Sequence, residues 1–354
     1  MAHSPDLVHL LSQVKLTLYG GLFEVVSKNP EVCEAVVELL HGHLVALVGQ
    51  QAEVPLERVV GEVDGEVVLL EPAGWFLHTV QAMVGKGEQL LDGENAELLE
   101  RLKVTLDKMA DHYAAAEPAD LGFDAGDTWD RKTREGERRH LKAEVVLTVF
   151  EALVEYVITH GGDSYLEKTD LLVRLQSKHA ALKAVMADGA SKKPKAVKKG
   201  RKEEEGGKKG EEAEGGKEKE TGGKRGRPGA DSPRKFVHPG QAISLKAVNI
   251  IVDALLTDRS PRHQAALSQL RNNEAFTSWI LALMADKLKQ VERNLSLTGN
   301  EGQSDGTFRY LAELAKSLFQ HTVYLDETVA SAVLPVAETL LVLLKMLLTS
   351  FPRR

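Results

Sequence analysis

Apolar residues recur at helical spacing along most of the chain. This spacing predicts amphipathic helices, each with one apolar face. The first stripe consists of Leu7, Leu11, Val14 and Leu18. Further stripes lie at Val32, Val36, Leu39 and Leu40; at Leu98, Leu102, Leu106, Met109 and Tyr113; at Leu141, Val145, Val149, Leu153 and Val157; at Leu171, Leu175, Leu182 and Val185; at Phe276, Ile280, Leu283 and Met284; and at Leu311, Leu314 and Leu318. The pattern predicts roughly a dozen helices joined by short links.

Local signals mark two helix starts and one turn. Asn29-Pro30-Glu31 combines a capping side chain, a proline suited to the first helical position and an acid near the positive end of the helix dipole. Ser260-Pro261 repeats the cap and the proline. Asp64-Gly65 is a favoured two-residue hairpin turn, and the valines around it alternate imperfectly with polar residues. We therefore expect one small β-hairpin among the helices.

The order of these elements favours an all-α fold. Successive amphipathic helices without parallel-strand signals are typical of an α-solenoid of stacked helix pairs, of the HEAT or armadillo kind. A globular bundle is the alternative, and we prefer the solenoid because no helix reads as apolar on every side. The most apolar run, Val329–Leu348, is interrupted by Pro335, Glu338 and Lys345, so it predicts a core helix and no membrane span.

Two segments break the helical pattern. An acidic loop is expected at 119–136, where aspartates gather after Pro118. A Lys/Glu/Gly-rich insert at 189–240 has no aromatic residue before Phe236 and cannot bury enough apolar area to order itself, so we expect it to be disordered.

Charge divides the chain in the same way. The 354 residues carry 45 Lys/Arg and 52 Asp/Glu, a net charge of -7. The stretch 189–235 holds 16 of these bases and 9 of these acids, which leaves 29 bases and 43 acids elsewhere. A body of net charge -14 thus bears an insert of net charge +7. The single cysteine, Cys33, excludes an internal disulfide framework and fits a reducing compartment.

The insert holds the one sharp chemical motif. Lys224, Arg225, Gly226, Arg227 and Pro228 look like the core of an AT-hook. Glycine lets an extended backbone reach the floor of the minor groove, and the flanking arginines follow its negative potential. The motif predicts contact with A/T-rich DNA, and a solvated linker without a specific role is the alternative.

Basic clusters lie upstream of this motif. They are typical of nuclear-localisation signals, and they could also contact phosphates without sequence preference. Ser232, followed by Pro233, is a candidate phosphorylation site, since a phosphate there would weaken DNA contact. The clusters consist of Lys192, Lys193, Lys195, Lys198, Lys199, Arg201 and Lys202.

No motif supports catalysis. The sequence contains no Walker motif, nucleophile elbow, nucleotide fingerprint or paired-carboxylate arrangement. We therefore expect no catalytic residue, cofactor, metal site or small-molecule substrate. The histidines outside the insert read as surface groups or satisfied core groups, among them His78, His112, His160, His179 and His321.

Several segments resemble the Fanconi anaemia group I family, in the same order. They are Val14–Val26, Val67–Pro72, Glu97–Leu102, Asp120–Asp124, Leu147–Tyr156, Leu267–Arg271 and Phe308–Leu311. None is a catalytic signature. The specificity lies in the shared order over nearly the whole chain.

The resemblance implies a nuclear, non-catalytic α-solenoid that acts in DNA interstrand cross-link repair. Family members clamp DNA as a heterodimer with a paralogue, the group D-two (FANCD2-like) protein, and monoubiquitination locks the pair on DNA. This chain corresponds to the middle of that architecture and is expected to be a fragment, so no ubiquitination or checkpoint-phosphorylation residue is carried over. A general HEAT-like protein-binding adaptor without DNA affinity is the alternative function.

The resemblance also implies a domain division. Residues 1–118 would be the C-terminal part of helical domain 2 and 137–354 a domain like solenoid 3, with the acidic loop between them. The family has a short loop where this chain has its insert at 189–240, so the role of the insert in DNA contact depends on its local motif alone.

Overall fold

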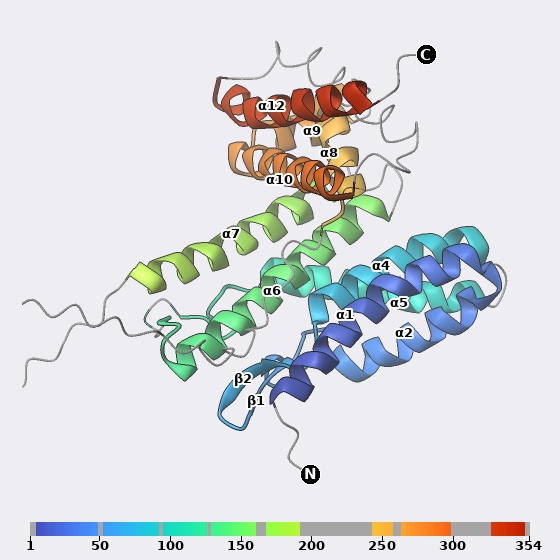
Figure 1. Ribbon diagram of the computed structural model, residues 1–354, viewed down its shortest axis with the longest axis vertical. Helices are drawn as coiled ribbons and strands as arrows, with labels where there is room; N and C mark the ends of the chain where they lie inside the picture. The colour runs from blue at the N-terminus through green and yellow to red at the C-terminus, as the bar shows by residue number, and fades with distance from the viewer. Residues whose placement is uncertain are drawn as a thin grey trace, which may run out of the picture.

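The computed structural model describes residues 5–48, 52–91, 95–124, 126, 129–160, 168–191, 243–257, 263–298 and 327–350. These residues form eleven α-helices and one two-stranded sheet, which confirms the all-α class with a single hairpin (Figure 1). In chain order the elements are α1 Pro5–Lys28, the 3-10 turn η1 Pro30–Val32, α2 Cys33–Val48, α3 Leu56–Val59, β1 Val60–Val63, β2 Glu66–Leu69, α4 Ala73–Leu90, α5 Asn95–Ala115, α6 Arg134–Thr159, α7 Thr169–Ser191, α8 Leu245–Thr257, α9 Gln264–Arg271, α10 Glu274–Thr298 and α12 Glu327–Ser350.

The hairpin forms where the sequence predicts it. Strands β1 and β2 pair antiparallel, with Val63 opposite Glu66 across a two-residue turn. Both turn residues have positive φ, 50° at Asp64 and 84° at Gly65, as a type I′ turn requires. The hairpin packs against α1 and α6.

The start predicted at Asn29 is correct in position, but its capping role is wrong. A 3-10 turn begins at Pro30, and the Asn29 side chain makes no cap bond to it. The Asn29 amide instead donates to the Val25 carbonyl at 3.1 Å and so closes the end of α1. The Ser260-Pro261 start and the stripe at 311–318 lie outside the described residues.

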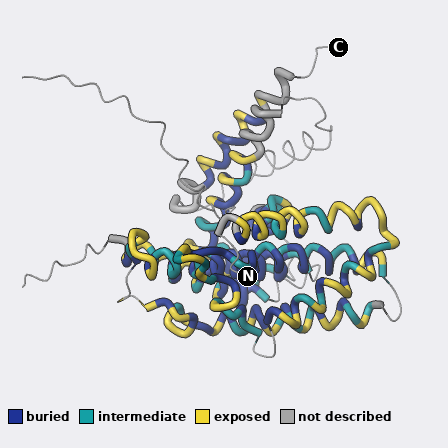
Figure 2. The backbone as a smooth tube through the Cα atoms, turned by 60° about the horizontal axis from the view of Figure 1, so that its bottom comes forward, coloured by how far each residue is buried: buried dark blue, intermediate teal, exposed yellow. Residues whose placement is uncertain are grey.

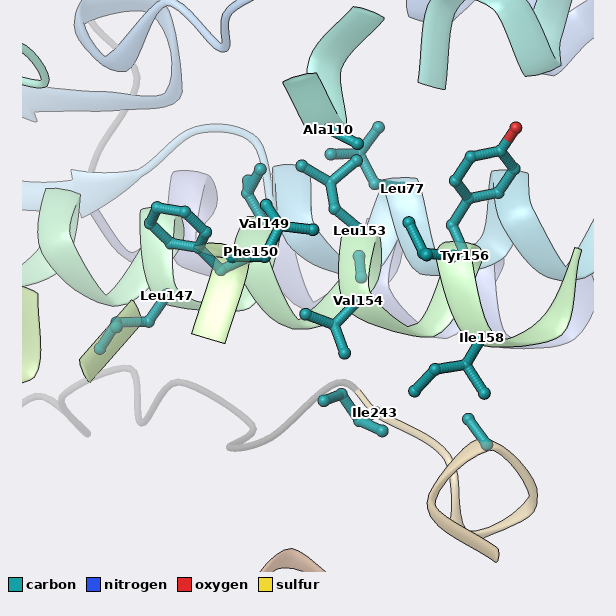
Figure 3. Close-up of a cluster of buried hydrophobic side chains, with 14 of the residues drawn as sticks. Leu77, Ala110, Leu147, Val149, Phe150, Leu153, Val154, Tyr156, Ile158 and Ile243 are labelled. Atoms are coloured by element: carbon teal, nitrogen blue, oxygen red, sulfur yellow. The ribbon is translucent and has the colours of Figure 1, made fainter. Parts of the chain in front are cut away.

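Helix α6 is buried on every side over half its length. Every residue from Val145 to Ile158 is buried, and α6 packs against α4, α5, α7, α8 and both strands. In Figure 1 it crosses the middle of the molecule, and Figure 3 shows its side chains directed toward Leu77 and Ala110 on one side and toward Ile243 on another. The expectation that no helix would be surrounded by others is wrong, because two glutamates interrupt the apolar run of α6 and disguise its burial.

A close approach of α4 to α6 depends on Gly74. A Cβ atom at this position would overlap the hydroxyl and backbone of Thr148 on α6. Burial in Figure 2 follows this packing, with buried positions gathered in the interior where the helices meet and exposed positions on the outer sides. Glycine at 74 thus sets the spacing between the two helices.

The last described helices form a second group. Helix α10 packs against α8, α9 and α12. Contacts of α7 with α9 and α10, and of α6 with α8, join this group to the rest of the body. The apolar run Val329–Leu348 lies in α12, as predicted. Among the described residues, no helix meets the length and hydropathy that a membrane span needs.

We predict that Gly74→Ala lowers the free energy of unfolding by about 1–3 kcal/mol, because the added methyl group overpacks the contact with Thr148. Urea titration followed by circular dichroism measures this change. Gly20→Ala is the matched control: Gly20 is an exposed residue inside α1 with open space around its Cβ position. Since alanine is the better helix former, this control should gain about 0.5–1 kcal/mol. Equal effects of the two substitutions would contradict the prediction.

Candidate functional site

The predicted functional residues lie outside the described part of the chain. This holds for the AT-hook-like motif Lys224–Pro228, for the basic clusters at 192–202 and for Ser232. The structure describes the two places where the insert leaves and rejoins the helical body. These two places and the helix that joins them form the candidate site.

The insert leaves the body at the end of α7, which continues to Ser191 and so into the segment assigned to the insert. The reason is a close contact: Gly189 lies against the indole of Trp129, where a Cβ would overlap the ring. Trp129 is buried, packs on Phe123 and lies edge-on to His140 of α6. His140 Nε2 lies 2.9 Å from the Trp129 carbonyl oxygen.

The acidic loop therefore also anchors itself in the core through its apolar and aromatic residues. Asp120 and Asp124 are exposed, as a solvated loop predicts, but Leu121, Phe123 and Trp129 are buried in the core. Aromatic residues within an acidic segment were the signal for this anchoring.

The insert rejoins the body at Ser244, directly before α8. Its backbone N–H and hydroxyl both donate to the Glu155 carboxylate of α6, at 2.9 Å and 2.6 Å. The Ser244 hydroxyl also accepts from Ala247 N–H at 3.2 Å, in the manner of a helix N-cap. The neighbouring Ile243 is fully buried near Val154 and Ile158 (Figure 3).

Glu155 is a buried charge with partners from two helices. His78 of α4 brings Nδ1 to 2.9 Å from its carboxylate, whose side chain is only 4% exposed. Burial alone would raise the pKa of Glu155, but the hydrogen bonds from His78 and Ser244 outweigh it and hold the pKa below its usual value. The carboxylate therefore stays ionised inside the protein and holds α4, α6 and α8 together.

A second buried acid lies one turn earlier on α6. Glu151 has its carboxylate 3.4 Å from His179 Nε2 of α7, and both side chains are almost fully buried. Burial lowers the pKa of His179 below its ordinary value, against the effect of Glu151. Burial likewise lowers the pKa of Lys287 on α10, with Glu151 and Glu155 acting in the opposite direction. Helices α4, α7 and α10 thus each supply one basic side chain to the acids of α6.

We call Glu151, Glu155, His78, His179, Ser244 and Lys287 the α6 joint. Sequence reasoning missed it because His78 and His179 read as isolated residues. The available signal was a pair of glutamates, four positions apart, inside the otherwise apolar run 145–158. Such a pair on a buried helix requires partners from its neighbours.

The joint connects helices of the body. Within the described ranges, no group of three or more His, Cys, Asp or Glu side chains could hold a metal ion.

A cavity of about 320 Å³ lies apart from the joint, between the start of α6, α3 and the loop 120–123. Its basic side chains are already paired, Arg138 and Lys142 with Glu57, and Arg139 with Glu135.

The chain is similar to two family models. FANCI helical domain 2 matches residues 10–187, and FANCI solenoid 3 matches residues 242–353. The first match runs through the acidic loop, α6 and α7, whereas the predicted division between the domains lies at 119–136. The α6 joint therefore connects the two matched ranges across the insert. The match to a solenoid domain confirms the predicted α-solenoid class.

Two relatives match most of the chain. It is 21% identical over 326 residues to the Fanconi anemia group I protein homolog of Mus musculus, and 21% identical over 323 residues to the Fanconi anemia group I protein of Gallus gallus. In both cases the match covers 87% of this chain and 21% of the relative. The chain thus spans about a fifth of the length of these relatives.

We predict that Glu155→Ala destabilises the protein by roughly 3–5 kcal/mol, because it leaves His78 and both donors of Ser244 without their buried acceptor. Thermal and urea unfolding measure this loss. Glu144→Ala is the control on the same helix: Glu144 pairs with the largely exposed Arg131, so its loss should cost about 0.5 kcal/mol or less. A small effect of Glu155→Ala would show that the joint does not hold the helices together.

Proposed function

This chain belongs to the Fanconi anaemia group I (FANCI) family, and we propose that it is a non-catalytic scaffold segment acting in DNA interstrand cross-link repair. The observation that carries the proposal is the α6 joint, which ties the two matched ranges to one buried helix and fixes the point where the insert rejoins the body. A firmly connected helical body that presents a basic segment suits a protein that holds other molecules in place.

We propose that DNA binds chiefly to the insert. The body has a net charge of -14 and repels DNA at long range, whereas residues 189–235 carry +7. Lys224, Arg225, Gly226, Arg227 and Pro228 form the DNA contact, and the basic clusters at 192–202 add phosphate contacts and a nuclear-localisation signal. Phosphorylation of Ser232 would weaken the contact by adding negative charge.

The described basic residues support this assignment. Bases gather at the start of α6, but they form ion pairs inside the chain: Arg131 with Glu144 and Arg134 with Glu62, both at 2.9 Å. A phosphate would have to displace these carboxylates and would still meet their charge. The start of α6 is therefore a poorer DNA surface than the insert.

We predict that the chain binds A/T-rich duplex DNA with an affinity that falls steeply from low to physiological salt. Arg225→Ala with Arg227→Ala should weaken binding about tenfold or more and remove the preference for A/T-rich over G/C-rich duplexes, measured by fluorescence anisotropy. The matched control is Lys217→Ala with Lys219→Ala, which removes the same charge from the same insert and should keep the preference.

The outcomes separate the candidate functions. If both double variants lose the same DNA affinity and neither the variants nor the unaltered chain prefers A/T-rich duplexes, the insert binds DNA only through its charge. This result would contradict the AT-hook assignment. No DNA binding by the unaltered chain would favour the alternative, a HEAT-like protein adaptor.

The partner proposed from family membership is a FANCD2-like paralogue, met in the nucleus. We predict that the tagged chain recovers this paralogue from nuclear extract, and that the Glu155→Ala variant recovers less of it because its two domains are no longer held in one orientation. Mass spectrometry of the recovered proteins measures both. Recovery of transport factors without the paralogue would support the adaptor function instead.

A further inference from the structure

Helix α1 leaves an apolar face without a partner. Its core face consists of Val8, Tyr19 and Val26, which are buried against the hairpin and α4. Six large apolar side chains on the other side are 43–56% exposed, and in Figure 1 α1 lies on the outside of the helices that it covers. The six are Leu7, Leu10, Leu11, Val14, Leu18 and Val25.

Polar contacts fix the rotation of α1, so this face cannot turn inward. The buried Ser12 hydroxyl donates to the Leu69 carbonyl. Lys15 Nζ donates to the Leu70 carbonyl at 2.8 Å and to the Glu71 carboxylate at 2.6 Å. The stripe that the sequence predicts at Leu7–Leu18 is therefore the outer face of a correctly predicted helix.

The spacing on this face is that of a coiled coil. Counted from Leu7, the seam positions fall alternately four and three residues apart, a repeat of 3.5 residues rather than 3.6. A straight stripe of this kind fits a second helix that crosses at a small angle. The seam positions are Leu7, Leu11, Val14, Leu18, Gly21 and Val25.

The seam is complementary to itself. When two copies run antiparallel about a two-fold axis at the level of residue 16, Leu7 faces Val25 and Val14 faces Leu18. Leu11 then faces Gly21, where the absent side chain makes room for it. A parallel pair would instead place Gly21 against Gly21 and leave a void. We propose that this face is a homodimer interface, formed by two antiparallel copies of α1.

The size and charge of the face agree with a second copy. The six side chains expose on the order of 100 Å² each, so pairing removes roughly 1,200 Å² from water, at the lower end for specific interfaces. Lys15 flanks the seam close to Lys15 of the second copy in this alignment, and each of these ammonium groups is paired with Glu71 of its own chain at 2.6 Å, which offsets their repulsion. We therefore expect a dimer with a dissociation constant in the micromolar range.

Sedimentation equilibrium on the full chain tests the interface. The unaltered chain should dimerise, and Leu11→Glu or Leu18→Glu should weaken the dimer at least tenfold with unchanged helix content. Leu39→Glu is the control: Leu39 is at least as exposed, at 61%, but lies on α2 outside the seam. A monomeric chain at high micromolar concentration, or equal effects of the three substitutions, would overturn the proposal.

Disulfide trapping tests the antiparallel alignment. Val14→Cys with Leu18→Cys in one chain should give an oxidised, covalently linked dimer, because these positions face each other in the antiparallel pair. Either single variant should not, because its two copies lie a helical turn apart, beyond disulfide reach. Native Cys33 is buried and does not compete. Efficient linkage of the Val14→Cys variant alone would overturn the alignment.

Discussion

A helix buried on every side cannot leave its polar groups to water, and helix α6 carries two carboxylates under this constraint. An uncompensated buried charge costs several kcal/mol, so Glu151 and Glu155 determine what neighbouring helices must offer. Helix α4 offers His78, α7 offers His179, and the start of α8 offers Ser244. Apolar contacts alone tolerate repacking with little loss. The bonds of His78 and Ser244 to Glu155, and the 3.4 Å contact of His179 with Glu151, therefore fix which turn of each neighbour lies against α6.

The same helix explains how the body accommodates a long insert. One end of the insert is fixed near His140 and the other at Glu155, positions about 22 Å apart along the axis of α6. The entropy of closing a loop between fixed ends grows only slowly with its length, so a long segment here costs little more than a short one. The insert can therefore differ between relatives without disturbing the joint.

How well a feature was predicted from sequence depended on how far apart along the chain its interacting residues lie. The hairpin depends on two adjacent residues, Asp64 and Gly65, and the helices depend on spacing within a few turns, so both were predicted. The joint depends on His78 and Ser244, which lie 77 and 89 residues from Glu155 and reach it only in the fold. Local patterns carry no information on such pairs. Trp129 likewise meets Gly189 and His140 only in the fold, although an aromatic residue within an acidic segment was a local sign of its burial.

The choice of the inner face of α1 follows the rule that governs α6. This helix has two apolar faces, one around Tyr19 and one around Leu11, and hydrophobic burial alone would accept either. Periodicity selects the more regular stripe, which is the outer one. The polar residues favour the other face as the inner one, because Ser12 and Lys15 reach the carbonyl oxygens of Leu69 and Leu70 only when the Tyr19 face turns inward. Turning the Leu11 face inward would leave those carbonyls and the Glu71 carboxylate without these donors. In a helix with two apolar faces, the directional bonds of a few polar groups determine which face becomes core and which stays available for contact.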